Sequence, residues 1–501
     1  MLTGIPAQRL KSFLLPAALA VVAVAITGEV TVNDSVKVGA ALVAGAILLL
    51  LLYLSGNPRL FCIWALMVAI PFDLSKRLSD IAAKMGGENS VRLEVSDLPL
   101  IALLLYQARD IWLGTMPGLR LPRVGWVWIA IIGLGMITIV SGPYRTVAAY
   151  EMIRMAKVLL LFVVVCNELN TSRRIGHAAA ALLLGVLLQS GVGLLQYAIQ
   201  GHLGLSILGE TGAGTLEQLA ADSVRTERSF RVGAFLQHPN IFGAFLACLL
   251  PLALGGWLAD RRPVYRAFYV ITLVAGMAAL ITTLSRSGWV SFFIATLVVG
   301  TLVMGRPSVR AKMVVPAIGA GAVLLAVMVI FSEHIATRLF ESKPDAILGR
   351  VEYARTAWGM IKAKPIMGWG LNSYVYEAPP FTRWGARGAK EFYEKSKNWL
   401  PPVHNIYLLW WSELGLVGLT LHLAVIAWIL RVAVRNLKVP DDTLFAINVA
   451  CIAGIIALMI DGFLSFTLRI NSVLRVFWVL AALIFAIHYW RLANPPAAQA
   501  P

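Results

Sequence analysis

The stretch PNIFGAFLACLLPLALGGWLA, residues 239–259, contains no charged side chain. At a rise of about 1.5 Å per residue, a helix over this run is long enough to cross about 30 Å of hydrocarbon. Comparable apolar runs recur from one end of the sequence to the other. The sequence therefore predicts an all-α integral membrane protein for which lipid is the main solvent.

The composition agrees with a membrane-embedded chain. Of 501 residues, 59% are hydrophobic and only 14% are charged, which is too few charges for the surface of a soluble domain. The formal net charge is +17. The basic residues are scattered through short loops instead of forming one stripe, so we expect no nucleic-acid partner. The four cysteines lie in apolar runs without metal-ligand spacing and are expected to be packing residues.

The apolar runs predict a polytopic bundle of about 14 transmembrane helices. We place the spans at residues 13–28, 36–55, 60–72, 97–113, 125–140, 147–167, 178–200, 239–259, 265–284, 287–304, 313–331, 405–432, 445–466 and 473–491.

Alternate short loops of this topology carry arginine and lysine, which the positive-inside rule assigns to the cytoplasm. These residues are Arg109, Arg120, Arg123, Arg173, Arg174, Arg261, Arg262, Arg266, Arg306, Arg310, Lys312, Arg431, Arg435 and Lys438. Both termini are then cytoplasmic, and the three longest loops, near 73–96, 201–238 and 332–404, face the outside or periplasm. We expect the bacterial inner membrane, with the active site on the outer face.

The predicted organisation has five parts. These are N-terminal transmembrane helices at 1–200, core transmembrane helices at 201–331 with the outer loop 201–238, a large outer loop at 332–404, C-terminal transmembrane helices at 405–491 and a cytoplasmic tail at 492–501.

The large outer loop has its own apolar periodicity. Ile347, Val351, Ala354, Trp358 and Ile361 recur at helical spacing and predict an amphipathic helix on the membrane surface that runs to Pro365. The aromatic and basic residues that follow suit sugars and anionic lipid heads, and they equally suit an ordinary interface belt.

His404 is the candidate catalytic residue. It follows Pro401-Pro402-Val403 and opens an apolar run, so it lies at the start of a predicted transmembrane helix. The positive end of the helix dipole disfavours imidazolium, which keeps the ring neutral as a general base requires. Asn405 is expected to cap the helix or orient the ring. A histidine at a membrane interface is more often a structural hydrogen-bonding group, so the assignment needs partners.

Two arginines on the same predicted face are those partners. Arg286 lies in the tight connection Leu284-Ser285-Arg286-Ser287-Gly288 between two long apolar runs, and Arg231 precedes the start of another run near Asn240. A guanidinium matches phosphate oxygens with two hydrogen bonds and stays protonated. Arg231 and Arg286 beside a histidine therefore describe a pyrophosphate clamp next to a base. Each one alone is also consistent with a snorkelling interface residue.

Charges within the predicted spans are functional candidates by default. Glu151 and Arg154 lie one turn apart in one span, and Asp461 lies in another, all in the outer halves of their helices. A Glu151–Arg154 ion pair that only locks helices together is the alternative. Glu413, nine residues after His404, falls on the opposite side of a straight helix and is not assigned to it.

Four stretches together resemble the O-antigen ligase and polymerase superfamily. They are Arg231-Val232-Gly233-Ala234-Phe235 through Asn240; Leu284-Ser285-Arg286-Ser287-Gly288; Gly349-Arg350 through Pro365-Ile366-Met367-Gly368-Trp369-Gly370; and His404-Asn405-Ile406-Tyr407 through Glu413-Leu414-Gly415-Leu416-Val417-Gly418. The resemblance covers roughly residues 225–430, and its pieces follow the order found in the family.

The resemblance implies a metal-independent, inverting glycosyl transfer from an undecaprenyl-pyrophosphate-linked glycan. In that family, Arg231 and Arg286 match the arginines proposed to hold pyrophosphate, and His404 matches the essential histidine. Asn405, Asn240, Arg350, Arg154, Glu151 and Asp461 are expected to support the site. No cofactor or metal is expected, and the other partners are a glycan or lipid A-core acceptor and the membrane lipids.

Several alternatives stay open from the sequence alone. Within the superfamily the acceptor could be a growing glycan, lipid A-core or a protein hydroxyl, so polymerase, ligase and protein O-oligosaccharyltransferase are all possible, with a slight preference for the first two. A secondary transporter, for example one resembling bicarbonate transporters, would suit the intramembrane charges, and a structural scaffold is a third class.

Overall fold

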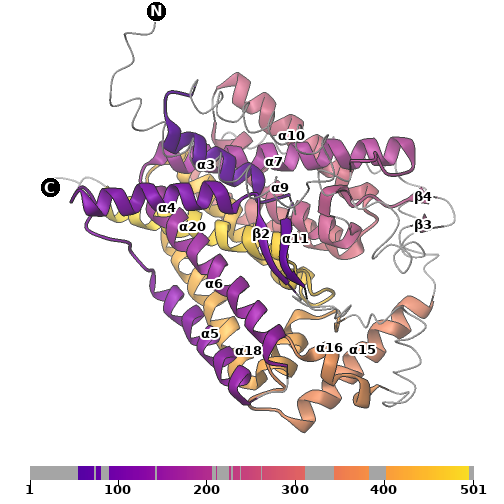
Figure 1. The fold of residues 1–501 in the computed structure, drawn as a ribbon. Helices are drawn as coiled ribbons and strands as arrows, with labels where there is room; N and C mark the ends of the chain where they lie inside the picture. The colour runs from indigo at the N-terminus through magenta and orange to yellow at the C-terminus, as the bar shows by residue number, and fades with distance from the viewer. Residues whose placement is uncertain are drawn as a thin grey trace, which may run out of the picture.

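The computed structural model describes residues 55–72, 75–80, 90–141, 144–205, 210, 225–226, 229–236, 238–260, 262–310, 344–382 and 402–495. This part of the chain is mainly helical (Figure 1). It also contains two antiparallel hairpins, β1 (Ser75–Asp80) with β2 (Ser90–Glu94) and β3 (Arg225–Thr226) with β4 (Ser229–Phe230).

Eight of the described helices are long and apolar enough to cross a membrane, which fits the predicted all-α membrane protein. They are α5 (Arg123–Ser141), α7 (Ser172–Ile199), α9 (Pro239–Ala259), α10 (Pro263–Thr282), α11 (Arg286–Met304), α18 (Ile406–Arg435), α19 (Asp442–Asp461) and α20 (Asn471–Ala493).

The remaining six predicted spans have two outcomes. Helices occur at three of them, α3 (Pro58–Ala69), α4 (Asp97–Trp112) and α6 (Arg145–Glu168), but α3 and α4 are short, and α6 carries several charged residues. The spans predicted at 13–28, 36–55 and 313–331 lie outside the described residues. All four cysteines are free and buried, as expected of packing residues.

At one end of the bundle, four helices are joined through Glu168 at the C-terminus of α6. Arg59 of α3 donates to both carboxylate oxygens of Glu168 at 3.0 Å and pairs with Asp110 of α4. Arg174 of α7 donates to Glu168 at 3.1 Å. We call Arg59, Asp110, Glu168 and Arg174 the anchor cluster. It lies at the end that the charge pattern assigns to the cytoplasm.

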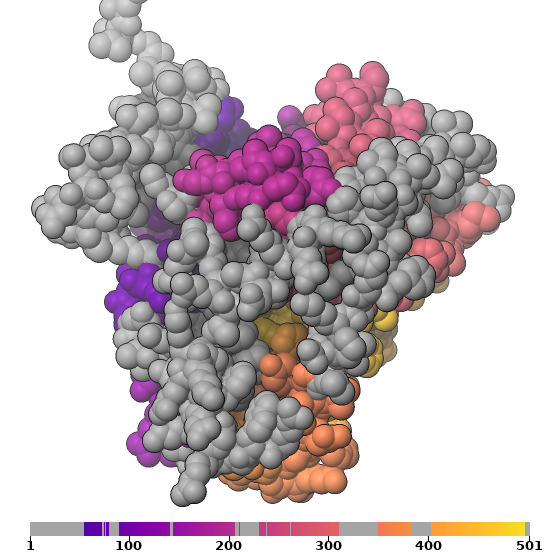
Figure 2. All heavy atoms as spheres, turned by 90° about the vertical axis from the view of Figure 1, so that its right-hand side faces the viewer, coloured from indigo at the N-terminus to yellow at the C-terminus, as the bar shows by residue number. Residues whose placement is uncertain are grey.

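Helices α9, α11 and α19 pack closely against one another. Where α9 meets α11, a Cβ on Gly288 would lie 3.0 Å from the carbonyl carbon of Gly243, so both N-terminal turns approach backbone to backbone. Figure 2 shows the molecule from the right-hand side of Figure 1. The pink atoms at its upper right belong to residues 240–310, and the orange atoms at its bottom belong to residues 344–382.

Helix α18 is broken at Gly415, where φ is +67°. The loop after α15 (Pro344–Ala363) satisfies the backbone groups that the break exposes. These hydrogen bonds run from Trp369 N to Ser412 O, from Gly370 N to Glu413 O, and from Leu416 N to Pro365 O, at 2.8 to 3.0 Å. A Cβ on Gly415 would lie only 2.0 Å from the carbonyl oxygen of Ile366, so no larger residue fits.

Helix α15 lies where the sequence predicts an amphipathic helix, and the residues of its apolar stripe differ in exposure. Val351 and Trp358 are 48% and 45% exposed, whereas Ile361 is 2% exposed. The reason is that α15 packs against α18 along a face that also includes Thr356 and Met360. Trp358 meets Trp411 of α18 edge to face at 5.7 Å.

Candidate active site

His404 lies directly before α18, between two aromatic rings. Tyr353 of α15 stacks on it with ring centroids 5.6 Å apart, and Phe466 meets it edge to face at 5.1 Å. The ring also hydrogen-bonds to the backbone of Pro402, which offers only a carbonyl acceptor. Within the described chain Nδ1 is buried without a hydrogen-bond partner. A neutral imidazole keeps one ring nitrogen with a free lone pair, so the unpartnered Nδ1 is the candidate proton acceptor.

Asn405 caps α18 as predicted. Its Oδ1 accepts hydrogen bonds from the N–H groups of Tyr407 and Leu408 at 3.0 Å, and its Nδ2 donates to the carbonyl of Phe463 at 3.2 Å. The backbone N–H of Ile406 donates to the carbonyl oxygen of Gly462 at 2.9 Å. The start of α18 is therefore fastened to the segment that follows α19, and His404 is fixed with it.

Burial, together with the nearby positive charge of Arg350, lowers the pKa of His404 to about 4, against the opposing hydrogen bond to Pro402. The sequence predicts that the helix dipole keeps the ring neutral, whereas in the structure burial is the largest cause of the lowered pKa. The imidazole is neutral at pH 7 by a wide margin, so its lone pair is available to accept a proton.

Asp461, the last residue of α19, is fully buried on the same side as His404. Its Oδ2 accepts a hydrogen bond from Thr467 Oγ1 at 2.5 Å, and Ser287 at the start of α11 also donates to the carboxylate. Arg350 interacts electrostatically with Asp461 as well as with His404. Within the described residues Oδ1 has no hydrogen-bond partner.

Arg286 is the first residue of α11 and is partly buried. The turn that presents it is constrained, because Leu284 has the left-handed φ of +52° and Ser285 Oγ accepts a hydrogen bond from the N–H of Gly288 at 3.4 Å. Arg286 and Arg350 lie close enough to repel each other. The structure therefore brings two guanidiniums from distant parts of the chain to one place.

Arg231 has a different environment from the one that the sequence suggests. It is 5% exposed, and its guanidinium donates to the carbonyls of Thr283 at 3.0 Å and Leu284 at 3.4 Å and to Asn240 Oδ1 at 3.0 Å. These contacts join the start of α9 to the connection between α10 and α11. Arg231 and Asn240 thus brace the turn that presents Arg286.

His238, the N-cap of α9, also lies in this region. Its Nδ1 accepts a hydrogen bond from the N–H of Asn240 at 3.1 Å. Burial, together with the charge of Arg231 and the ring of His404, lowers the pKa of His238 to about 3. We call His404, Asp461, Arg231, Arg286 and Arg350 the His404 site. It unites a neutral base with three guanidiniums and one carboxylate.

A family model described as O-antigen ligase matches residues 243–423, which include Arg286, Arg350 and His404. This range is similar to the O-antigen ligase domain, and it covers less than half of the chain. The match confirms the predicted resemblance, and together with the apolar helices it supports a membrane glycosyltransferase of the ligase or polymerase type. Such an enzyme acts on a lipid-linked glycan and an acceptor, and it fits a bacterial membrane. No curated protein matches the chain significantly.

Arg231 and Asp461 lie outside the residues that match the O-antigen ligase domain, although both contact elements that begin within or beside it. Inside the domain, the break at Gly415 explains two of the stretches quoted from the sequence. Pro365–Gly370 and Glu413–Gly418 hydrogen-bond to each other and form one backbone assembly.

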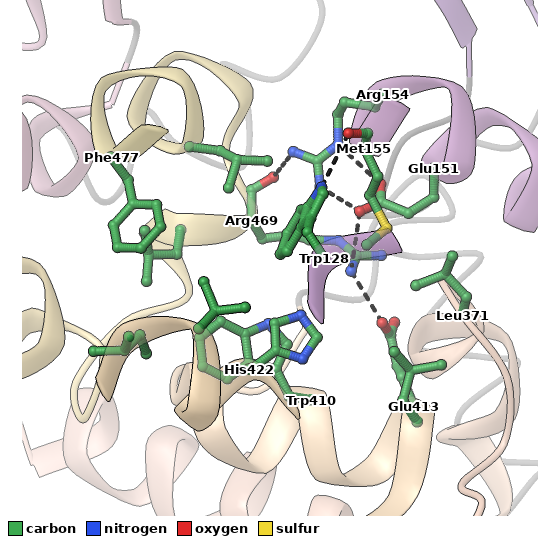
Figure 3. A pocket seen from close by; sticks show the side chains of 15 residues that line it. Trp128, Glu151, Arg154, Met155, Leu371, Trp410, Glu413, His422, Arg469 and Phe477 are labelled. Carbon is green, nitrogen blue, oxygen red and sulfur yellow. Dashed lines mark hydrogen bonds and ion pairs between the residues drawn. The ribbon is translucent and has the colours of Figure 1, made fainter. Parts of the chain in front are cut away.

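Glu151 and Arg154 are not at the His404 site. They form the buried ion pair that the sequence left as an alternative, with Arg154 Nε donating to Glu151 Oε2 at 2.9 Å. Arg469 lies between Glu151 and Glu413 and completes a separate cluster (Figure 3). The sequence analysis did not identify Arg469, Tyr353 or Phe466. Arg469 is a charge within a short polar interruption between two apolar runs, which was the one available signal.

Proposed function

We propose that the protein transfers a glycan from an undecaprenyl-pyrophosphate-linked donor to an acceptor hydroxyl at the outer face of the bacterial inner membrane. The observation that carries this proposal is His404 Nδ1, a buried lone pair with no partner in the described chain, next to Arg350 and near His238. A neutral base among cations suits a reaction in which a hydroxyl loses a proton while an anionic group departs.

In the proposed step the acceptor oxygen attacks the anomeric carbon of the donor sugar, and the bond from that carbon to the pyrophosphate oxygen breaks. His404 Nδ1 takes the acceptor proton, and the departing polyprenyl pyrophosphate keeps the electron pair. A single displacement inverts the anomeric configuration.

The departing pyrophosphate needs positive charge where its own charge develops. We propose that Arg286 and Arg350 contact it, while Arg231, already bound to three acceptors, braces the turn and adds positive potential. The N-terminal turns of α9 and α11 meet here and add aligned N–H dipoles. This arrangement needs no divalent metal, so we propose metal-independent transfer.

The decisive experiment uses purified protein with an undecaprenyl-pyrophosphate-linked oligosaccharide, and compares wild type with His404→Ala. A product ladder from the wild type alone would indicate a polymerase, a single shift on added lipid A-core a ligase, and labelling of a peptide hydroxyl a protein oligosaccharyltransferase. Chelator should not inhibit. A wild type without His404-dependent product on any acceptor would overturn the proposal, and inhibition reversed by added magnesium would overturn its metal independence.

The break in α18 is the observation that favours a secondary transporter, because discontinuous helices line many transport sites. Here the backbone groups at the break are bound by the 365–370 loop, and the adjacent Glu413 is bound by Arg469. A site whose groups are already satisfied has little capacity for an ion. The break in α18 therefore favours a role in binding the 365–370 loop over a role in transport.

A further inference from the structure

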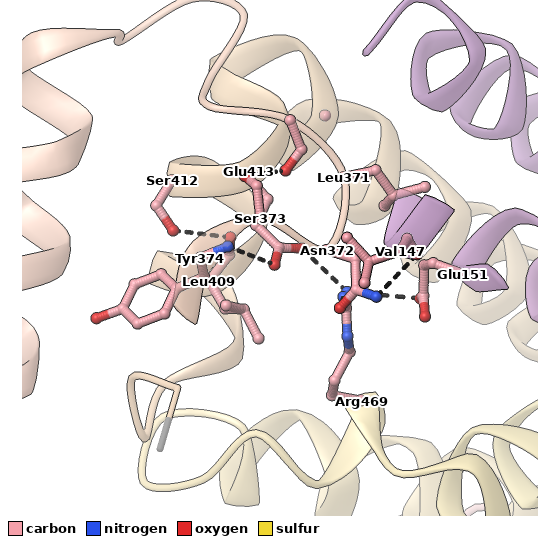
Figure 4. A network of polar contacts seen from close by, with 12 residues as sticks. Val147, Glu151, Leu371, Asn372, Ser373, Tyr374, Leu409, Ser412, Glu413 and Arg469 are labelled. Atoms are coloured by element: carbon pink, nitrogen blue, oxygen red, sulfur yellow. Dashed lines mark hydrogen bonds and ion pairs between the residues drawn. The ribbon is translucent and has the colours of Figure 1, made fainter. Parts of the chain in front are cut away.

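Arg469 ends the short 3-10 helix η5 (Thr467–Arg469), which lies between α19 and α20. Its Nη1 donates to Glu413 Oε2 at 3.0 Å and lies 3.5 Å from Glu151 Oε1. Its Nη2 donates to Asn372 Oδ1 at 2.8 Å. The carbonyl of Arg469 accepts a hydrogen bond from Arg154 Nη1 at 2.7 Å. Arg469 is therefore held through its side chain (Figure 4) and through its backbone carbonyl (Figure 3).

We call Arg469, Glu151, Arg154, Glu413 and Asn372 the Arg469 network. Its members come from α6, from the turn after α15, from α18 and from η5. All of these side chains are at least nine-tenths buried. Removing the guanidinium would leave the Glu413 carboxylate in an apolar interior without its cation, which is destabilising, while Glu151 would keep its pair with Arg154.

The other end of the same segment contacts the His404 site. Phe466, three residues before Arg469, packs its edge on the His404 ring, and Thr467 donates to Asp461. Because η5 is a single helical turn, Thr467 and Arg469 cannot move independently. The position of Arg469 therefore sets the positions of two groups that touch the candidate base and carboxylate.

The segment that follows α15 also contacts the Arg469 network. Asn372 adopts a left-handed φ of +61°, donates to the carbonyl of Val147 at 2.9 Å and accepts from Arg469. The N–H of Tyr374 donates to Glu413 Oε1 at 3.3 Å. This segment follows α15, which carries Arg350 and Tyr353. The two sides of the His404 site are thus joined through one guanidinium.

A cavity of about 40 Å³ borders the network and is lined by Trp128, Trp410 and His422 in addition to Glu151, Glu413 and Arg469 (Figure 3). Such a volume admits about two waters. The space is too small for a sugar, so the cavity supports no ligand role for the network. It does give a shortened side chain at position 469 room to shift.

We propose that Arg469 is a positioning residue for glycan transfer. By binding α6, the Asn372 turn and α18 together, Arg469 fixes η5. Phe466 and Thr467 then hold the His404 ring and the Asp461 carboxylate in a fixed position relative to Arg350 and Tyr353 of α15. This inference rests on the proposed function and adds a residue that does not touch the substrates.

The test compares Arg469→Met, Arg469→Lys and Thr467→Val, each purified as the full chain. A displacement of about 1 Å can cost about 100-fold in rate, so we expect kcat of Arg469→Met to fall about 100-fold with little change in KM. Arg469→Lys keeps the charge and should recover part of the loss. Thr467→Val leaves the network intact and should lower kcat alone.

Arg306→Met is the matched control. Arg306 also binds several acceptors, among them the carbonyls of Val439 and Pro440 and the carboxylate of Asp442, but at the opposite ends of α11 and α19. It should lose thermal stability without a change in the kcat of the folded protein. If Arg469→Met behaves in the same way, with normal kcat per folded molecule, the positioning role is refuted.

A second readout does not depend on transfer. The rate at which diethyl pyrocarbonate modifies His404, measured by peptide mass spectrometry, should rise several-fold in Arg469→Met and stay unchanged in Arg306→Met. An unchanged rate in Arg469→Met would overturn the positioning inference. Absence of His404-dependent transfer by the wild type would instead overturn the proposed function, and the modification rates would still decide whether Arg469 positions His404.

Discussion

The anchor cluster and the His404 site both gather charged groups where helices end, but their groups are paired to different degrees. In the anchor cluster, the buried Glu168 accepts hydrogen bonds from Arg59, Arg174 and Gln107. In the His404 site, the guanidiniums of Arg231, Arg286 and Arg350 lie near one carboxylate of the described residues, that of Asp461. Two buried atoms of that site, His404 Nδ1 and Asp461 Oδ1, have no hydrogen-bond partner in the described chain.

This difference separates a structural cluster from a candidate reactive one. A buried polar atom without a partner costs about 1–3 kcal/mol, so such atoms persist where something other than stability requires them. In the anchor cluster both carboxylate oxygens of Glu168 accept hydrogen bonds from side chains, although the neighbouring Gln107 Oε1 is buried without a partner in the described chain. The His404 site has an excess of positive charge and a free lone pair, which an anionic donor and an acceptor hydroxyl would satisfy.

The largest effect is expected for His404→Gln. The amide fills a similar volume but cannot serve as a base, and general-base catalysis contributes about 10²- to 10⁴-fold. We therefore expect kcat to fall by about 1,000-fold with normal thermal stability, measured on the purified protein. His177→Gln is the matched control, since His177 is partly buried at the anchor-cluster end of α7. A His404→Gln protein with more than a tenth of wild-type turnover would remove His404 as the base.

The next effect should appear in stability and not in turnover. Arg59→Met removes one partner of the buried Glu168 carboxylate, and breaking a buried pair costs about 3 kcal/mol. Thermal unfolding in detergent should move to lower temperature, while kcat per folded molecule stays at the wild-type value. A loss of kcat without a loss of stability would contradict the division between the two regions.

Arg286→Lys tests the geometry of the positive charge. Lysine keeps the charge but loses the planar fork that binds two phosphate oxygens at once. We expect kcat/KM to fall about 100-fold. Arg266→Lys, in the first turn of α10 and so at the other end of that helix, should have no effect and serves as the control. Equal activity of the two variants would mean that Arg286 does not recognise the donor.

The smallest effect is a shift in pH dependence. The charged or titratable groups that act on His404 in the described structure are Arg350, Tyr353 and His238. Arg350 disfavours the imidazolium, so Arg350→Gln should raise the pKa of His404 from about 4 toward its ordinary value. The neutral fraction at low pH then falls, and the acid limb of kcat/KM moves to higher pH. Lys362→Gln, on the same helix, should leave the limb in place.

Local physical rules account for what the sequence predicted well. Asn405 caps α18 because its side chain can bind the orphan N–H groups of the first turn, and Pro239 begins α9 because proline needs no N–H there. The location of His404 and Arg286 at helix starts follows from the same signals. The match to the O-antigen ligase model shows that the order of short motifs was also informative.

Sequence reasoning did not foresee the contacts of residues whose environment depends on distant segments. Arg231 looked like a free clamp, but its guanidinium is bound by carbonyls more than 50 residues away. Glu151 and Arg154 looked like residues of the His404 site. In the structure Arg154 pairs with Glu151 and donates to the carbonyl of Arg469, so both belong to the Arg469 network. The break at Gly415 was not predicted, because a glycine in an apolar run is compatible with a continuous helix.

The sequence by itself determined that this is a helical membrane protein, because an apolar run of about 20 residues has one favourable solvent, and it located the helix starts that carry His404 and Arg286. The tertiary structure alone decided which charges are neutralised and which stay available. Pairing depends on contacts between residues such as Asn372, Glu413 and Arg469, whose distances are fixed only when the helices pack.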